Sequence, residues 1–137
     1  MLTLPQIYAK TDELRRRNAQ YVRFLRTKKG YNSKGQGFIA VQSHSTRTVD
    51  KNGKQISGPS DTKYISMVTF IDKKLHVVCS CSCPDFMYRQ EVALNKKGAA
   101  EIEYSNGELP TTTNSRMITY FCKHLCQIFF TIEKQIV

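Results

Sequence analysis

The segment VVCSCSCPDF, residues 77–86, decides how this 137-residue chain folds, together with Cys122-Lys123-His124 near its end. Alternate residues of a strand point to the same side, so a Cys-x-Cys pair at a strand end offers two thiolates to one ion. Residues two apart in a helix diverge by about 200°. Cys122 and His124 therefore converge only where a helix begins, which puts Cys122 just before the last helix. The pattern predicts a metal site that joins a strand end to a helix start.

The strand half of this site has two candidate ligand pairs. Cys79 and Cys81 have the same spacing as Cys81 and Cys83. Pro84 helps to end a strand, which favours the later pair. A third interpretation is that the cysteines are buried without a metal, but a strand in which serines alternate with cysteines is a poor apolar strand.

The helix half also has an alternative. Cys126 lies four residues after Cys122 and is interpreted as a small core residue. If Cys126 replaced His124, the site would be all-cysteine, and an iron–sulfur cluster would suit it. With three thiolates and one imidazole, zinc is the expected ion, and a closed set of four ligands leaves no position for substrate.

These motifs resemble the SWIM zinc finger family, whose pattern is Cys-x-Cys, a variable spacer and Cys-x-His. The resemblance covers residues 64–132 and implies that a ββα-like core is stabilised by zinc. By that resemblance the ligands are Cys81, Cys83, Cys122 and His124. The spacer of 38 residues is longer than in most members, which indicates an insert at about 87–120. The family is associated with DNA or protein binding.

Length and composition favour one α+β domain without a membrane anchor. The chain is too short for two comfortable domains, and it has no run approaching the roughly 20 apolar residues of a membrane span. No N-terminal stretch resembles a secretory signal. Five cysteines cannot all pair, and their clustering fits metal ligation in a reducing compartment. We expect an intracellular protein of the cytoplasm, nucleus or virion.

The formal charge of +10 is concentrated at the N-terminus. Residues 1–34 carry nine Lys and Arg against two acids, +7, while residues 35–137 carry twelve against nine, +3. A positive field attracts polyanions, so the expected partner is nucleic acid, DNA more than RNA, or an acidic protein surface. Tyr31 is available for base stacking. The candidate phosphate-binding residues are Arg15, Arg16, Arg23, Arg26, Lys28, Lys29 and Lys34.

The N-terminal part is predicted to be a basic helix and loop arm over residues 1–36. Thr3 and Gln6 have the spacing of a capping box, and apolar residues at helical spacing predict a helix over residues 2–26. The apolar stripe of that helix comprises Ile7, Leu14, Tyr21 and Leu25. Residues 27–36 mix glycine with three lysines and predict an exposed loop.

The second part, residues 37–137, is predicted to be a single SWIM-like domain built on an antiparallel β-meander. Strands are expected over 38–48, 64–71 and 75–81, with a turn at Asn52-Gly53. Within the insert we expect a short helix over 85–95 and a hairpin over 101–110. The apolar spacing of residues 123–134 predicts an amphipathic helix packed on the sheet.

These features favour a small non-catalytic zinc module that associates with nucleic acid through its basic arm. The alternative is a protein-interaction or structural subunit of a larger assembly, which includes a viral one. An enzyme with Cys122 or Cys126 as nucleophile and His124 as base is disfavoured, because residues so close in sequence rarely have the needed geometry. No acidic orienter or phosphate loop accompanies them.

Overall fold

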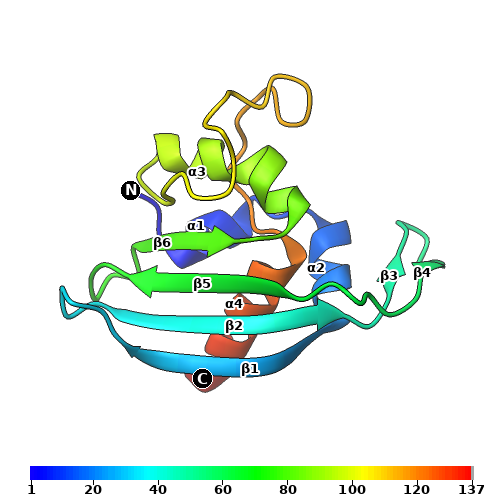
Figure 1. The fold of residues 1–137 in the computed structure, drawn as a ribbon, viewed down its shortest axis with the longest axis horizontal. Helices are drawn as coiled ribbons and strands as arrows, with labels where there is room; N and C mark the ends of the chain where they lie inside the picture. Colours follow the sequence, from blue (N-terminus) through cyan, green and yellow to red (C-terminus); the bar gives the residue numbers. More distant parts are fainter. Residues whose placement is uncertain (137) are drawn as a thin grey trace.

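A four-stranded antiparallel sheet with helices against one face forms the centre of the fold (Figure 1). The computed structural model describes residues 1–136. The sheet has the strand order β1-β2-β5-β6, and a separate hairpin pairs β3 with β4. The strands are β1 (Val22–Tyr31), β2 (Gly37–Ser45), β3 (Thr48–Val49), β4 (Gln55–Ser57), β5 (Tyr64–Phe70) and β6 (Val77–Cys81). The helices are α1 (Leu4–Ala9), α2 (Glu13–Ala19), the π-helix η1 (Phe86–Gln90), α3 (Glu91–Lys96) and α4 (Lys123–Ile136).

The N-terminal segment is not the single helix predicted over residues 2–26. The capping box is present, because Thr3 accepts from the Gln6 N–H and Gln6 accepts from the Thr3 N–H. However, α1 ends at Ala9, and Asp12 caps a second helix by accepting from the Arg15 N–H. Tandem caps of this kind divide a helix into two short ones.

The predicted apolar stripe of that helix is also wrong beyond its first turn. Ile7 is buried, but Leu14 and Leu25 are 40% and 41% exposed. From Val22 the chain enters β1, which pairs with β2 from Val22 to Tyr31 with one register shift between Phe24 and Arg26. The segment is rich in β-branched and aromatic residues, and pairing with a distant strand overrides its helical periodicity.

Half of the predicted basic loop over residues 27–36 is instead strand. Residues 27–31 continue β1, and Lys34 lies in the turn that leads to β2. Asn32 closes this turn by accepting from the Lys34 and Gln36 N–H groups. The boundary at residue 36 falls in the same turn, and the division into an arm and a domain stays a prediction.

The strands predicted downstream are confirmed as an antiparallel meander, β2-β5-β6, that the small β3-β4 hairpin interrupts. The turn at Asn52-Gly53 is present, and Gly53 has a φ of +82°, which favours glycine. Opposite residues share a face, so Thr27, Val41, Ser66 and Cys81 form one row across the inner face. This row places a cysteine at the β6 end of the core.

Helix α4 is confirmed and packs on the inner face of the sheet, where Leu125 and Ile128 are fully buried. The helix expected over 85–95 is present as η1 followed by α3, and Gly98 ends it with a φ of +73°. The hairpin expected over 101–110 is wrong, because no strand forms there. Instead, the Glu91 carboxylate accepts from the N–H groups of Glu103, Tyr104 and Ser105. In the described part of the chain, no helix is long and apolar enough to cross a membrane.

Candidate metal centre

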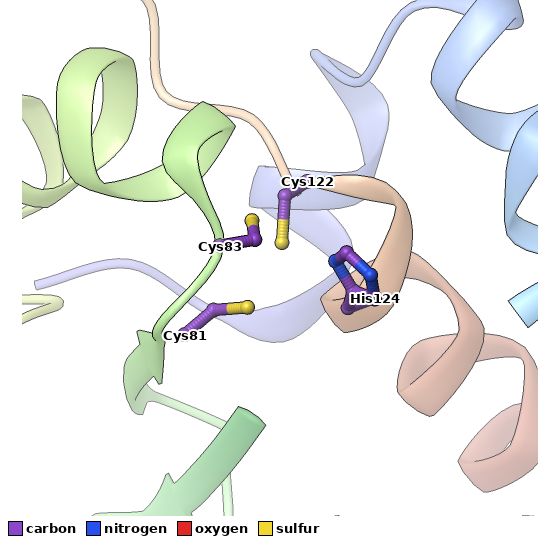
Figure 2. A group of neighbouring side chains, drawn as sticks. All are labelled: Cys81, Cys83, Cys122 and His124. Carbon is purple, nitrogen blue, oxygen red and sulfur yellow. The ribbon is translucent and has the colours of Figure 1, made fainter. Parts of the chain in front are cut away.

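Four buried side chains from two parts of the chain meet between the end of β6 and the start of α4 (Figure 2). They are Cys81, Cys83, Cys122 and His124. Their sulfur and nitrogen ligand atoms all lie within 4.8 Å of one another. A zinc ion with ligand bonds of about 2.0–2.3 Å would sit among atoms roughly 3.5–3.8 Å apart. The group could therefore close on one metal ion with a small contraction.

Local backbone structure explains why these residues converge. Cys81 is the last residue of β6, and Cys83 follows in the turn that leads to η1. Cys122 directly precedes the first residue of α4, and its carbonyl accepts from the Cys126 N–H. His124 lies in the first turn of that helix, as the spacing of the motif predicted.

The segment that enters α4 is held by side chains distant in sequence. Gln90 accepts from the Tyr120 N–H at 2.8 Å, and the Thr11 hydroxyl accepts from the Phe121 N–H at 2.9 Å. Both contacts are buried. They fix the position of Cys122 relative to β6, which nothing in the local motif specifies.

His124 is the residue whose surroundings point most directly to a ligand. The residue is 2% exposed, and among the described residues neither ring nitrogen has a hydrogen-bond partner. A buried polar atom without a partner costs about 1–3 kcal/mol, so native structures rarely contain one. A metal ion would satisfy one of these nitrogens.

Hydrogen bonds among the three thiols shift the pKa values of Cys81 and Cys122 in opposite directions. Burial raises the pKa of each, but hydrogen bonds from Cys122, Cys83 and Ser66 hold the pKa of Cys81 well below its ordinary value. Burial and the neighbouring thiols raise the pKa of Cys122 well above the usual range. A bound cation would favour the ionised form of all three thiols.

Cys79 and Cys126, the two competing ligands, do not belong to the cluster. Successive residues on one face of a strand are about 6.6–6.8 Å apart, so a regular strand cannot bring three alternate cysteines to one ion. Cys79 instead packs in the core, and burial raises its pKa to about 12. Burial likewise raises the pKa of Cys126 to about 12. Both are expected to remain neutral thiols at pH 7.

Other groups orient the sulfur atoms from outside the cluster. The Ser66 hydroxyl lies 3.2 Å from the Cys81 Sγ, and the Phe86 N–H donates to the Cys83 Sγ at 3.4 Å.

The Lys123 ammonium donates to the Thr48 hydroxyl at 3.3 Å. Burial lowers the pKa of Lys123, whereas the thiolates of Cys83 and Cys122 oppose this effect. A cleft of about 330 Å³ reaches the cluster from outside.

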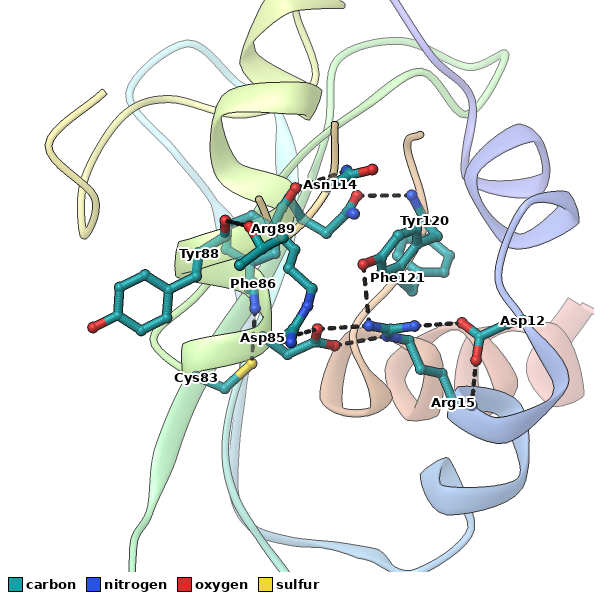
Figure 3. Close-up of polar contacts among 12 residues, drawn as sticks. Asp12, Arg15, Cys83, Asp85, Phe86, Tyr88, Arg89, Asn114, Tyr120 and Phe121 are labelled. Carbon is teal, nitrogen blue, oxygen red and sulfur yellow. Dashed lines mark hydrogen bonds and ion pairs between the residues drawn. The ribbon is translucent and has the colours of Figure 1, made fainter. Parts of the chain in front are cut away.

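An ion-pair network that the sequence analysis missed supports the loop after Cys83 (Figure 3). Arg15 makes a two-point contact with Asp85 at 2.7 Å and also pairs with Asp12. Its guanidinium lies over the Tyr120 ring, 4.1 Å from the centroid. Burial opposes the charge of Arg15, but the Asp85 contact outweighs it and raises the pKa of the guanidinium. No local pattern links Arg15 to Asp85, because 70 residues separate them.

The seven basic residues predicted to bind phosphate fall into two groups. Arg15 and Arg16 are engaged within the molecule, and Arg16 donates to the Tyr8 carbonyl while lying over the Tyr8 ring. The other five are exposed and lie on β1 or its following turn. They are Arg23, Arg26, Lys28, Lys29 and Lys34. Pairing with β2 places Arg23, Arg26 and Lys28 on the outer face of the sheet, opposite α4.

In comparisons with known proteins, the chain matches no protein-family model, no curated protein and no solved structure.

Proposed function

We propose that this protein is a SWIM-type zinc module in which Cys81, Cys83, Cys122 and His124 bind one structural zinc ion. The observation that carries the proposal is the buried cluster with two unpartnered nitrogens on His124. Three thiolates and one imidazole suit zinc in a tetrahedral site. Such a site stabilises the fold and leaves no position for substrate, so the proposed module is non-catalytic.

Metal analysis of the purified protein tests the zinc proposal. The wild type should hold one zinc per chain, and Cys83→Ser and His124→Ala should each lose most of it. Cys79→Ser and Cys126→Ser are matched controls that should retain the metal, since both residues lie outside the cluster. Full zinc retention in both ligand variants would contradict the proposed set. Iron with acid-labile sulfide would instead favour a cluster.

We further infer that the module associates with nucleic acid through the basic outer side of β1. Arg23, Arg26 and Lys28 share the outer face, and Lys29 and Lys34 are exposed nearby. Side chains on one face of a regular strand repeat about every 6.8 Å, so the row can follow a phosphate backbone. Such contacts are largely independent of sequence and depend on salt. We expect DNA to bind more readily than RNA.

Binding to a labelled DNA duplex across a salt series tests this interface. Each phosphate contact contributes about −0.9 to the slope of log K against log salt, so Arg26→Gln with Lys28→Gln should reduce the slope by about 2. Lys73→Gln with Lys74→Gln, in the exposed β5-β6 turn, removes the same charge elsewhere. Equal losses in both double variants would show attraction by net charge alone and contradict a β1 interface.

A further inference from the structure

The two edges of the four-stranded sheet differ in their main-chain partners. Beside β6, the Val77 N–H donates to the Leu2 carbonyl and the Cys79 N–H donates to the Ala99 carbonyl. A β-bridge between Thr3 and His76 extends this cover. Over residues 22–31, by contrast, the described main chain pairs only with β2. The outer edge of β1 is therefore open.

The open edge is long and regular enough to accept another strand. The only register shift against β2 lies between Phe24 and Arg26, and pairing then runs without a break from Arg26 to Tyr31. Six residues of antiparallel strand extend about 20 Å, which is the usual length of a strand in a sheet. Alternate residues along this stretch direct N–H and C=O groups toward the open side.

The charge of the edge decides which strand it would accept. β1 carries Arg23, Arg26, Lys28 and Lys29 and no acidic residue, and all four are exposed. Lysine and arginine on an edge disfavour pairing between two copies of this chain, because like charges would lie opposite each other. The same charges would stabilise a strand that carries Asp or Glu.

Gly30 is a second feature of the open edge, and its effect does not depend on charge. A glycine inside a strand weakens it, and it often marks a place where another backbone approaches closely. A Cβ at Gly30 would meet only the Phe38 ring, at an ordinary contact distance of 3.5 Å, and the φ of Gly30 is not positive. The chain's own packing therefore does not require glycine here.

A groove lies beside Gly30, and its lining runs from Lys29 in β1 to Ile132 in α4. It has a volume of about 440 Å³. Gly30, Tyr31, Phe38 and Phe70 lie along it, and Tyr31 is 79% exposed. These surroundings suit an apolar side chain.

From these observations we propose that the β1 edge binds an extended acidic segment of a partner protein by strand addition along Arg26–Tyr31. Main-chain hydrogen bonds would supply affinity, and alternating acidic residues would pair with the basic side chains. The proposal goes beyond zinc binding and nucleic-acid association and requires neither. It concerns the main-chain N–H and C=O groups at the edge of β1. A nucleic acid cannot pair with these groups as a β-strand does.

The test uses the full chain as purified and a capped, labelled decapeptide in which Glu alternates with Val. A second peptide carries methyl groups on the main-chain nitrogens of four consecutive central residues, which blocks both of its edges and keeps its charge. With two hydrogen bonds lost on the binding edge, the methylated peptide should bind at least about tenfold more weakly. The unmethylated peptide should also slow amide exchange within residues 26–31.

A charge swap supplies the matched protein variants. Arg26→Glu with Lys28→Glu should abolish binding of the Glu peptide and gain binding of its Lys counterpart, whereas Lys73→Glu with Lys74→Glu should change neither. Equal binding of methylated and unmethylated peptides would show attraction by charge alone and overturn the proposal. Slower amide exchange elsewhere than β1, with none within residues 26–31, would overturn it too. Duplex DNA binding, measured on the same preparations, separates this outcome from failure of the nucleic-acid interface.

Discussion

The β6 edge and the β1 edge of the same sheet differ in how their side chains and main chain are satisfied. At the β6 edge, Cys79 and Cys81 are fully buried, and the N-terminus and Ala99 cover the main chain. At the β1 edge, the charged side chains are exposed and the outer main chain is open. One edge therefore serves the core and the Cys/His cluster, while the other leaves its main-chain groups unpaired among the described residues.

Removal of the proposed metal should have the largest effect, and this effect should fall on the β6 edge and not on the β1 edge. Because the proposed zinc joins β6 to α4, Cys83→Ser or chelation should reduce the free energy of unfolding by on the order of 5 kcal/mol. Hydrogen exchange should show protection lost first at β6 and the start of α4, with β1-β2 pairing lost later. Loss of protection that begins at β1 would contradict the distinction between the edges.

The Arg15-Asp85 pair offers the next largest effect. The side chains of Arg15 and Asp85 are 24% and 27% exposed, so each charge is partly desolvated. Arg15→Met leaves Asp85 without its main partner, and we expect a loss of about 2 kcal/mol in denaturant unfolding. A double-mutant cycle with Asp85→Asn should give a coupling energy above about 1 kcal/mol. Additive losses would contradict a direct role of the pair in holding the turn after Cys83.

Glu91→Gln tests how the insert is attached beside β6. The fully buried Glu91 carboxylate accepts three main-chain N–H groups of residues 103–105, and the amide can reproduce only part of this arrangement. We expect a loss of about 1–2 kcal/mol and faster proteolysis within residues 101–109. Glu108→Gln, at an exposed position, is the control. An unchanged cleavage rate would indicate that other contacts hold this segment.

Charge changes on β1 should have little effect on folding. Arg26→Gln and Lys28→Gln remove exposed charges that form no ion pair among the described residues, so unfolding free energies should stay within about 0.5 kcal/mol of the wild type. Binding of DNA or of an acidic peptide should fall in the same variants. A larger loss of stability would mean that these side chains serve the fold.

Acid titration should show a small pH-dependent contribution to stability at the β6 side of the sheet. Although desolvation acts in the opposite direction, hydrogen bonds from His76 and the main chain lower the pKa of Asp72. A carboxylate with a lowered folded pKa stabilises the protein above its ordinary pKa of about 3.9, and this contribution is lost as the pH falls through the folded value. Asp72→Asn should therefore reduce the slope of stability against pH below about pH 4 in acid unfolding titrations, and an unchanged slope would contradict this contribution.

Short-range patterns predicted the elements that depend on neighbours in sequence. The capping box at Thr3, the turn at Gly53 and the apolar spacing of α4 are each decided within a few residues, and all three are present. The predicted ligands also lie together, because spacing in a strand and at a helix start limits which side chains can converge.

The N-terminal prediction failed where a distant partner decides the structure. Residues 22–26 satisfy a helical period and a strand composition equally well, and pairing with β2 selects the strand. The loop over residues 101–110 has the turn signal of a hairpin, but the buried Glu91 carboxylate holds its main chain instead. Neither partner can be identified from the local residues.

The residue types of the Cys/His cluster, the positive charge and the elements with strong local signals follow from the amino-acid sequence alone. Only the tertiary structure decided that His124 is buried without a partner, that Arg15 supports the turn after Cys83 and that one edge of the sheet is open. The physical reason is that ligand type and charge belong to single residues. Burial, ion pairing and strand exposure depend on which distant residues share the same space.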